Sequence, residues 1–242
     1  MRIIGLILVG VLLAPAALAQ QTTITIGPTG ATTSTDPDEA RREQMVVAAN
    51  KLIIEHEYQR ALDEKLTPVI REYESIPRKG NPLLYSARSM PETLFYMAQA
   101  ASQKRDGIAL GFAYGYAYYF SAFAQTELKH SIEAEALLRK AVELSPMNSL
   151  FLGELGYHIQ QTGDSVGALE MFKRAESATE FSPESAKSFD KGRALRGEGY
   201  ALVELGKLDE AEAAYNAALK LDPNDKKSQG ELEYIRKRKA KR

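Results

Sequence analysis

A period of 34 residues runs through the second half of this 242-residue chain and restricts its fold more than any other feature. Two segments, Ser149 to Ser182 and Gly192 to Asp225, carry glycine and alanine at matching places among apolar residues. A third segment, Gly115 to Asn148, precedes them in the same register, except that Lys129 stands where the others have a turn glycine. Such a period indicates stacked units that each bury an apolar face against the next.

The last unit has the pattern of two antiparallel helices. Gly199 and Ala211 lack bulk where the helices cross, so the two backbones can approach closely. Gly206 suits a turn residue that needs a positive φ, and Pro223 ends the second helix because proline cannot continue it. Apolar side chains at helical spacing supply the packing faces: Leu195, Leu202, Leu208, Tyr215 and Leu219.

This pattern resembles the tetratricopeptide repeat, a helix-turn-helix unit of 34 residues. The resemblance predicts an all-α fold, a right-handed α-solenoid of such repeats with a C-terminal capping helix. The predicted boundaries are a signal peptide at 1–19, a disordered threonine-rich tether at 20–40, a divergent helical region at 41–106, a unit with an extended first helix at 107–148, a unit at 149–182, a unit with an N-terminal insertion at 183–225 and a basic capping helix at 226–242.

The N-terminus resembles a bacterial secretory signal peptide. A positive start is followed by eleven apolar residues, Ile3 to Leu13, and by a small-x-small pattern, Ala17 to Ala19, before Gln20. The apolar stretch is shorter than the roughly 20 residues of a stable membrane span. We therefore expect cleavage after Ala19 and a periplasmic protein, with an uncleaved anchor as the alternative.

Two shorter patterns predict local structure. The segment from Gln20 to about Ala40 has little to bury, so we expect a flexible tether in which Asp36-Pro37-Asp38 forms a turn. Downstream, Ser89-Met90-Pro91-Glu92 is a capping box that opens a helix. In the insertion, Ser182 and Pro183 are expected to start a helix as its N-cap and first residue.

The run from Gly107 to Gln125 has no charged side chain, although 26% of the chain is charged. Its length would allow a membrane span, but four tyrosines lie in its middle, whereas spanning helices keep tyrosine at the interfaces. We interpret it as the first helix of a repeat, covered by neighbouring helices. Gly107, Gly111 and Gly115 recur every four residues and would allow close packing against the preceding helix.

Catalytic chemistry has little support in the sequence. The three histidines, His56, His130 and His158, lie on separate units without a metal-binding spacing, and the chain has no cysteine. No stretch remains for a catalytic domain of ordinary size. We predict no enzymatic activity, no cofactor and no metal, although a carboxylate site stays open. The net charge of −1 gives no global attraction to nucleic acid.

The resemblance implies that certain sites of each first helix line a concave groove. The candidate peptide-binding residues at these sites are Tyr116, Tyr119, Phe123, Tyr157, Gln160, Arg193, Arg196 and Tyr200. The lysine and asparagine with which some family members clamp a carboxylate are absent, so that clamp is not carried over. Aromatic and arginine side chains dominate binding energy at many protein interfaces. The alternative is that these residues only pack between helices.

The sequence thus predicts an exported non-catalytic adaptor that binds a protein or peptide partner, as an extended peptide or a helix, in its groove. An alternative function uses the basic residues between Arg236 and Arg242, which could contact anionic lipid or cell-wall polymer. The same charges also complement the dipole of a terminal helix, for about 0.3–1 kcal/mol each.

Overall fold

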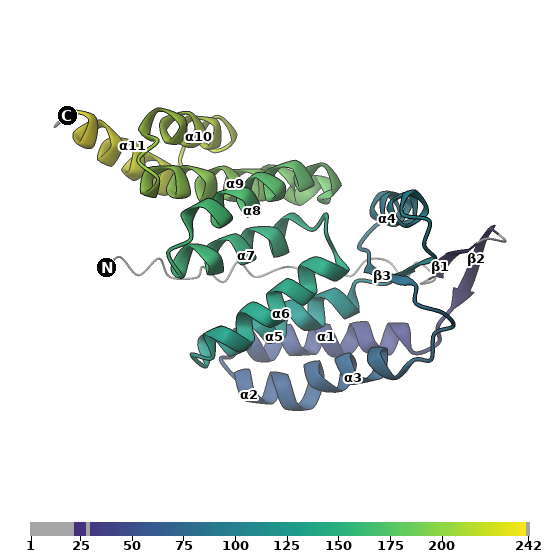
Figure 1. The fold of residues 1–242 in the computed structure, drawn as a ribbon. Helices are drawn as coiled ribbons and strands as arrows, with labels where there is room; N and C mark the ends of the chain where they lie inside the picture. The colour runs from purple at the N-terminus through teal and green to yellow at the C-terminus, as the bar shows by residue number, and fades with distance from the viewer. Residues whose placement is uncertain (1–21, 28–29, 241–242) are drawn as a thin grey trace. The chain divides into compact units, whose positions relative to one another are not determined.

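The computed structural model describes residues 22–27 and 30–240, with side chains from residue 36 onward, and most of this part is helical (Figure 1). The signal peptide predicted at 1–19 lies outside the described residues, as do Lys241 and Arg242 of the basic tail. The chain forms two compact units, residues 1–137 and residues 138–242, which are described separately below.

Unit 1 combines paired helices with a small sheet. Helix α1 packs against the stretch from α2 to α3 and against α5. Within the region 41–106, which we predicted to be helical, the segment Leu83–Ser86 is instead a strand. The elements are β1 (Thr22–Gly27), β2 (Gly30–Thr35), α1 (Glu39–Ile54), α2 (Tyr58–Ala61), a π-helical turn η1 (Leu62–Leu66), α3 (Thr67–Ser75), β3 (Leu83–Ser86), α4 (Met90–Ser102), β4 (Gly107–Leu110) and α5 (Ala113–Glu127). Helix α6 (Ser131–Leu144) crosses the boundary between the units.

The sheet corrects the prediction of a disordered tether at 20–40. Strands β1 and β2 form an antiparallel hairpin, and the strand order is β2-β1-β4-β3, with β4 antiparallel to β1 and parallel to β3. Ile24 pairs with Ala109 and Ile26 with Gly107, so backbone hydrogen bonds to a distant strand offset the ordering entropy. The alternating threonines and isoleucines of β1 favour a strand. The composition of the segment, taken without the order of its residues, does not indicate this.

The uncharged run divides into β4 and α5, so the predicted extension of the first helix to residue 107 is wrong. Helix α5 begins at Ala113, and nearly all of its side chains as far as Ala124 are buried. This burial accounts for the missing charges. Over the described part of the chain, no helix combines the length and the apolar character needed to cross a membrane.

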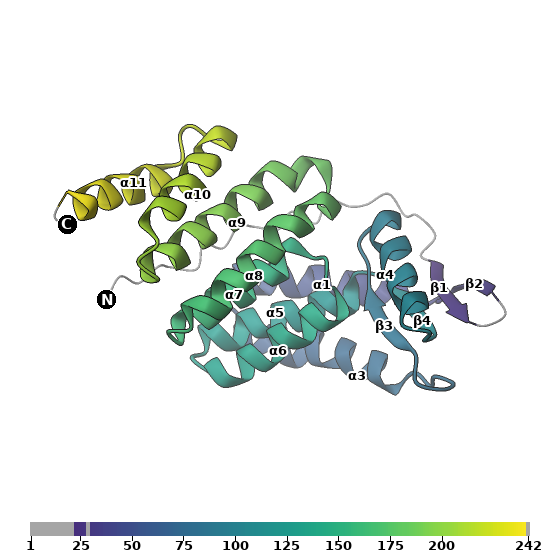
Figure 2. The same ribbon diagram turned by 45° about the horizontal axis from the view of Figure 1, so that its top comes forward.

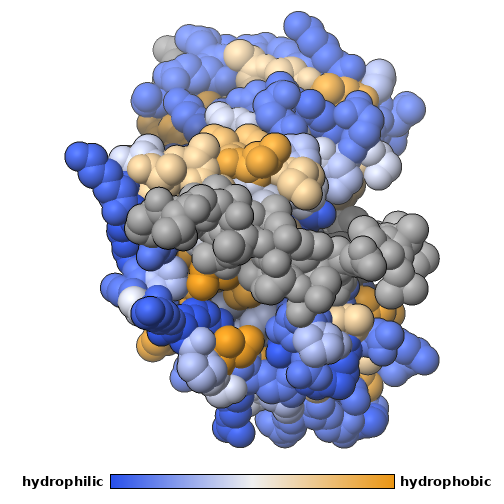
Figure 3. All heavy atoms as spheres, turned by 90° about the vertical axis from the view of Figure 1, so that its right-hand side faces the viewer, coloured by the Kyte–Doolittle hydropathy of each residue, from blue (hydrophilic) through white to orange (hydrophobic). Residues whose placement is uncertain are grey.

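Helix α4 begins at the predicted capping box and packs on the sheet. The Ser89 side chain accepts a hydrogen bond from the Glu92 N–H at 3.4 Å, and the Glu92 carboxylate accepts one from the Arg88 N–H at 2.6 Å. A Cβ on Gly107 would lie 2.8 Å from the Cβ of Ala100, so this glycine permits the close approach of β4 and α4. The view of this side of the molecule shows apolar residues gathered in a band (Figure 3).

Unit 2 is a succession of helical hairpins (Figures 1 and 2). Helix α7 packs against α8 and α9, α9 packs against α8 and α10, and α10 packs against α11. Residues 149–182 thus form the helix pair predicted there. The elements are α7 (Ser149–Gln161), α8 (Ser165–Ala178), a 3-10 turn η2 (Thr179–Phe181), α9 (Glu184–Glu204), α10 (Leu208–Leu221) and α11 (Lys226–Lys239).

A single ring, Phe172 of α8, lies where α7, α8 and α9 come together. It is completely buried. A Cβ on Gly156 of α7 would lie 2.8 Å from its ring, and a Cβ on Gly197 of α9 would clash with the same ring. A Cβ on Gly199 of α9 would lie 2.7 Å from the ring of Tyr215 of α10. This confirms the close crossing predicted for that glycine. The helices therefore stack at distances that only glycine allows.

The turns between paired helices share one backbone conformation. Gly163 and Gly206 have φ values of +92° and +74°, as predicted for a positive-φ turn at Gly206. Lys129, between α5 and α6, adopts φ +69° although it has a side chain. The turn therefore keeps its left-handed geometry even where the sequence departs from glycine.

The insertion and the terminal helix largely follow the sequence. Helix α9 starts at Glu184 and runs for 21 residues, so the insertion lengthens its N-terminal end. Pro183, rather than Ser182, is the N-cap, and the Ser182 hydroxyl instead donates to Asp190 at 2.6 Å. In α11, Leu232 and Ile235 are buried on one face, as expected of a capping helix.

We expect Gly197→Ala to destabilise unit 2 by about 1–3 kcal/mol, since the added methyl overlaps the buried Phe172 ring. Gly153→Ala is the matched control, because nothing lies within 4 Å of a Cβ at that position of α7. There the better helix propensity of alanine should be neutral or slightly stabilising. Urea unfolding followed by circular dichroism measures both, and equal effects would contradict the proposed role of Phe172.

Candidate functional site

The sequence-predicted residues of unit 2 come together across α7 and α9, which lie side by side. We call the surface formed by Tyr157 of α7, by Arg193, Arg196 and Tyr200 of α9 and by Lys227 of α11 the tyrosine–arginine face. Both arginines act electrostatically on Tyr157 and on Lys227, and both tyrosines act on the buried Tyr215. These residues therefore occupy one neighbourhood.

Each arginine of this face is held by a carboxylate from a neighbouring helix. Arg193 forms an ion pair with Glu154 of α7, and the two side chains are 15% and 13% exposed. Arg196 pairs with Asp225, the N-cap of α11, at 3.2 Å, with 21% and 10% exposed. Partly desolvated pairs of this kind fix the orientation of arginine. The arginines thus link α9 to the helices on either side.

Tyr157 and Tyr200 are both half-buried. The ring of Tyr157 packs edge-on against Phe172, with the centroids 4.8 Å apart. Burial raises the pKa of Tyr157, and Arg193 partly opposes that shift. Burial also raises the pKa of Tyr200, and the negative charges of Glu204 and Glu231 raise it further. Both hydroxyls therefore stay protonated at neutral pH and can donate or accept hydrogen bonds.

Lys227 adds a third positive charge to the face, at the start of α11. Burial lowers the pKa of Lys227, and the nearby Arg196 lowers it further, against the effect of Asp225. Arg193, Arg196 and Lys227 lie among the carboxylates of Glu154, Asp225, Glu204 and Glu231, so the face carries charges of both signs. Rigid aromatic rings beside a lysine suit a ligand with an apolar side chain and an acidic group.

Gln160, the remaining candidate of unit 2, makes a hydrogen bond between two helices of its own repeat. Its amide Nε2 donates to the Ser165 hydroxyl at 2.9 Å, which links the end of α7 to the start of α8. This contact occupies the amide nitrogen, whereas the Gln160 Oε1 is buried without a hydrogen-bond partner among the described residues.

The candidates of unit 1 lie on α5. Tyr116 and Tyr119 are only 4% and 7% exposed, and Tyr116 packs against Phe112 and Phe120. Their burial supports the packing alternative for these two residues. Phe123 is half-buried, with its ring 6.4 Å from that of Tyr58. That Phe123 shares a surface with the tyrosines of unit 2 stays a prediction.

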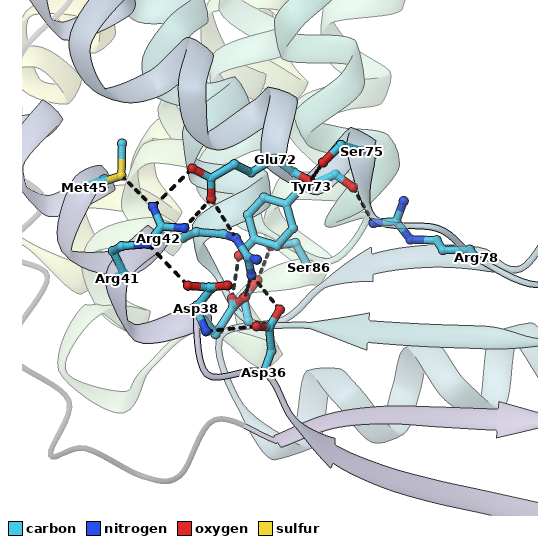
Figure 4. Close-up of polar contacts among 12 residues, drawn as sticks. Asp36, Asp38, Arg41, Arg42, Met45, Glu72, Tyr73, Ser75, Arg78 and Ser86 are labelled. Atoms are coloured by element: carbon cyan, nitrogen blue, oxygen red, sulfur yellow. Dashed lines mark hydrogen bonds and ion pairs between the residues drawn. The ribbon is translucent and has the colours of Figure 1, made fainter.

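A charged cluster in unit 1, which the sequence did not suggest, joins α1 to α3 (Figure 4). Arg42 is 4% exposed and donates to Asp36 at 2.6 Å, to Glu39 at 3.2 Å and to Glu72 at 3.3 Å. The Tyr73 hydroxyl donates to Glu39 at 2.6 Å, and the Arg42 guanidinium lies 4.7 Å from the centre of the Tyr73 ring.

The environment of this cluster indicates a structural role. Burial raises the pKa of Glu39, against its hydrogen bonds from Tyr73 and Arg42. Burial acts to raise the pKa of Asp36, but the hydrogen bonds from Arg42 and from the Asp38 N–H, together with the positive charges of Arg42 and Arg41, outweigh it and the pKa is lowered. Because Glu39 and Arg42 are almost fully buried, a ligand has little access to either.

Asp36 accepts a hydrogen bond from the Asp38 N–H at 2.9 Å, so the predicted turn is confirmed.

The basic tail is engaged with its own unit. Arg238 donates to the backbone carbonyl of Val203 near the C-terminus of α9, at 3.1 Å. Lys239 forms ion pairs with Asp209 and Glu212 of α10, both at 2.5 Å. These contacts attach the end of α11 to the last hairpin and complement the dipole of α9.

The histidines do not form a site. His158 is buried, whereas His56 and His130 are exposed and contact Tyr58 and Gln125 respectively. Among the side chains described, no three histidine, aspartate or glutamate residues are arranged to hold a metal ion.

Comparisons with known proteins agree with the repeat architecture. Residues 115–148 and residues 192–225 each match a tetratricopeptide repeat family model. Between them, α7 and α8 form the same kind of hairpin over residues 149–182. The chain thus contains tetratricopeptide repeats, with an all-α solenoid as its main architecture and the small sheet of unit 1 as an addition. No curated protein matches its sequence.

Two solved structures of MamA have the same fold at low identity. MamA from residue 41 onward, from Desulfovibrio magneticus RS-1, is 14% identical, with a TM-score of 0.55 over 83% of this chain and 86% of that one. The MamA RS-1 ArsTM double mutant is 15% identical, with a TM-score of 0.52 over 82% and 85%. The first TPR of Spaghetti (RPAP3), bound to an HSP90 peptide, is 20% identical, with a TM-score of 0.47 over 52% and 93%.

Glu198 of α9 is a buried carboxylate between α8 and α9. It is 8% exposed, and its Oε1 is buried without a hydrogen-bond partner in the part of the chain that the structure describes. Burial and the neighbouring Glu176 raise the pKa of Glu198 to about 7, against smaller effects of Lys173 and Lys191. The charged form is therefore disfavoured in the folded protein.

This shift predicts pH-dependent stability. The ordinary pKa of glutamate is 4.5, so between about pH 4.5 and 7 the folded state binds more protons at Glu198 than the unfolded state does. Stability therefore falls as the pH rises through this window. We expect Glu198→Gln to unfold at higher urea than the wild type at pH 8, by on the order of 2 kcal/mol, and to differ little at pH 4.

The control for this experiment is Glu170→Gln, which changes an exposed carboxylate of α8 and should stay within about 0.5 kcal/mol of the wild type at both pH values. A gain for Glu198→Gln that is equal at pH 4 and pH 8 would contradict the assignment.

Proposed function

We propose that this chain is an exported, non-catalytic adaptor that binds an extended peptide or a partner helix across the tyrosine–arginine face. The repeat architecture supports a protein-interaction role, because stacked repeats offer extended surfaces rather than enclosed pockets. The observation that carries the proposal is the exposed part of Tyr157 and Tyr200 beside Arg193 and Arg196. Preorganised aromatic and arginine side chains bind at little cost in side-chain entropy.

The ligand chemistry follows from the charges of this face. Arg193 and Arg196 already hold carboxylates, so a ligand acid gains most from Lys227, whose pKa is lowered by burial and by Arg196. An apolar or aromatic side chain of the peptide would cover the Tyr200 ring. We therefore infer a preference for peptides in which an acidic residue lies near an aromatic one.

Attachment to an anionic surface through residues 236–242 is the less supported alternative. Arg238 and Lys239 already make contacts within unit 2, and Lys237 pairs with Glu233 at 2.6 Å. A surface that recruited these groups would have to replace those contacts.

Tyr200→Ala tests the binding face. Peptides are first selected on the wild-type protein from a displayed random library, and their affinity is then measured by fluorescence polarisation. We expect at least tenfold weaker binding, since truncating an interface hot spot costs about 2 kcal/mol or more. Val166→Ala, which shortens an exposed side chain on α8, should bind as the wild type does. Unchanged affinity for Tyr200→Ala with intact helicity would refute the proposal.

Export has its own test. When the chain is produced with residues 1–19 in a Gram-negative host, we expect it in the periplasmic fraction with Gln20 as its first residue. Ala19→Phe should block cleavage because a small residue is needed there, whereas Leu18→Phe changes the tolerant position between the two alanines. Recovery of the wild-type chain with Met1 intact in the membrane fraction would instead support the uncleaved anchor.

A further inference from the structure

The N-terminal extension of α9 carries an exposed aromatic residue on the side that the tyrosine–arginine face occupies. This residue, Phe189, is 46% exposed and precedes the repeat matched at 192–225. Spacings of three and four residues place side chains in one stripe along a helix. Four residues of α9 follow each other at such spacings: Phe189, Arg193, Arg196 and Tyr200. Phe189 therefore continues the tyrosine–arginine face beyond Arg193.

The opposite side of the extension is attached to the neighbouring repeat. Lys191 pairs with Glu176 of α8 at 3.4 Å, and Lys187 pairs with Glu180 of η2 at 3.0 Å. The turn η2 packs on both α8 and α9. Both lysines are two residues from Phe189, which is about half a turn around the helix. These ion pairs thus hold the back of the extension, and the phenylalanine faces away from α8.

The surface between the two rings of α9 is polar. Arg193 and Arg196 occupy the positions of the stripe between Phe189 and Tyr200. Gly192 adds no side chain there, and Nη1 of Arg196 lies 3.4 Å from the place that its Cβ would take. The apolar contacts that α9 offers on this side are therefore concentrated at the two ends of the stripe.

This distribution favours an extended ligand over a helical one. A partner helix laid along α9 needs apolar contacts at every turn of the seam, and the arginines do not supply them. An extended peptide needs apolar contacts only where its side chains meet the rings. Between those points its backbone carbonyls can accept hydrogen bonds from arginine N–H groups.

We propose that Phe189 anchors a peptide that lies along α9 in an extended conformation. The inference rests on the binding function proposed above, and it adds the conformation of the partner and a second apolar residue. Phe189 and Tyr200 are eleven residues apart, about 16 Å along a helix, which about five residues of extended chain cover. The partner therefore carries an apolar residue about five positions from its aromatic residue.

The acidic residue of the partner lies between these two anchors. Lys227 interacts electrostatically with both Arg196 and Arg193, so it lies near the middle of the stripe. An acid that reaches Lys227 is therefore flanked by the side chains that contact Phe189 and Tyr200.

Peptide selection tests the anchor. A displayed library of random dodecapeptides is selected in parallel on the full wild-type chain and on Phe189→Ala. We expect the wild type to enrich an apolar residue about five positions from an aromatic one. Phe189→Ala should keep the aromatic and acidic residues but lose the apolar one. The same apolar preference on both proteins would overturn the inference, and a wild-type chain that selects no peptide would overturn the binding function as well.

The affinity of one fluorescein-labelled peptide selected on the wild type measures the contact. We expect Phe189→Ala to weaken binding about tenfold. Replacing the apolar residue of the peptide by alanine should weaken binding to the wild type similarly but add little in Phe189→Ala, because both changes remove one contact. Ser188→Ala, an exposed neighbour on another side of α9, should bind as the wild type does.

The outcomes separate this inference from the function on which it rests. If Tyr200→Ala weakens binding and Phe189→Ala does not, the face binds peptide and the anchor is wrong. If neither variant weakens binding, the binding function fails too. Because nearly half of the Phe189 side chain is exposed, Phe189→Ala should retain wild-type helicity by circular dichroism. Carbon chemical shifts of the isotope-labelled peptide in the complex report its conformation, and helical values would overturn the extended arrangement in favour of a partner helix.

Discussion

Close approach of helices at glycine is the constraint on which the repeat stack of unit 2 depends. Phe172 fills the space between α7 and α9 only because Gly156 and Gly197 have no side chain to oppose it. The edge of the Tyr157 ring rests on that same phenylalanine, so the packing that joins the hairpins also orients a residue of the candidate binding face. The contact between Phe172 and Tyr157 therefore belongs both to the packing of the hairpins and to the candidate binding face.

The repeated part of the fold could be predicted because its signals are local. A turn residue, small residues at the helix crossing and a proline after the second helix lie within 34 residues of one another, and all of them reappear in the structure. The four-stranded sheet could not be predicted in the same way. It pairs residues 24–26 with residues 107–109, and no short pattern in either segment identifies the other. Threonine content indicated flexibility, whereas the alternation of isoleucine and threonine was the relevant signal.

The candidate site was predicted in part. Register within the repeats brought Tyr157, Arg193, Arg196 and Tyr200 to one neighbourhood, but it could not reveal that each arginine already holds a carboxylate. Asp225 belongs to the next helix, and its side chain is placed by the N-cap geometry of α11. The Arg42 cluster of unit 1 could not be predicted for a related reason, because two partners of Arg42 lie six residues before and thirty residues after it in the chain.

Asp225 bonds both to the first turn of α11 and to Arg196, so it links the end of the solenoid to the candidate binding face. One oxygen accepts from the first turn of α11 at the N–H of Lys227, while the other accepts from the Ser228 hydroxyl and from Arg196. Carboxylate lone pairs are limited in number, so a ligand acid that drew Arg196 away would also redistribute the bonds that hold the terminal helix in place. If the proposed ligand binds at this face, its binding and the order of α11 would be linked through Asp225.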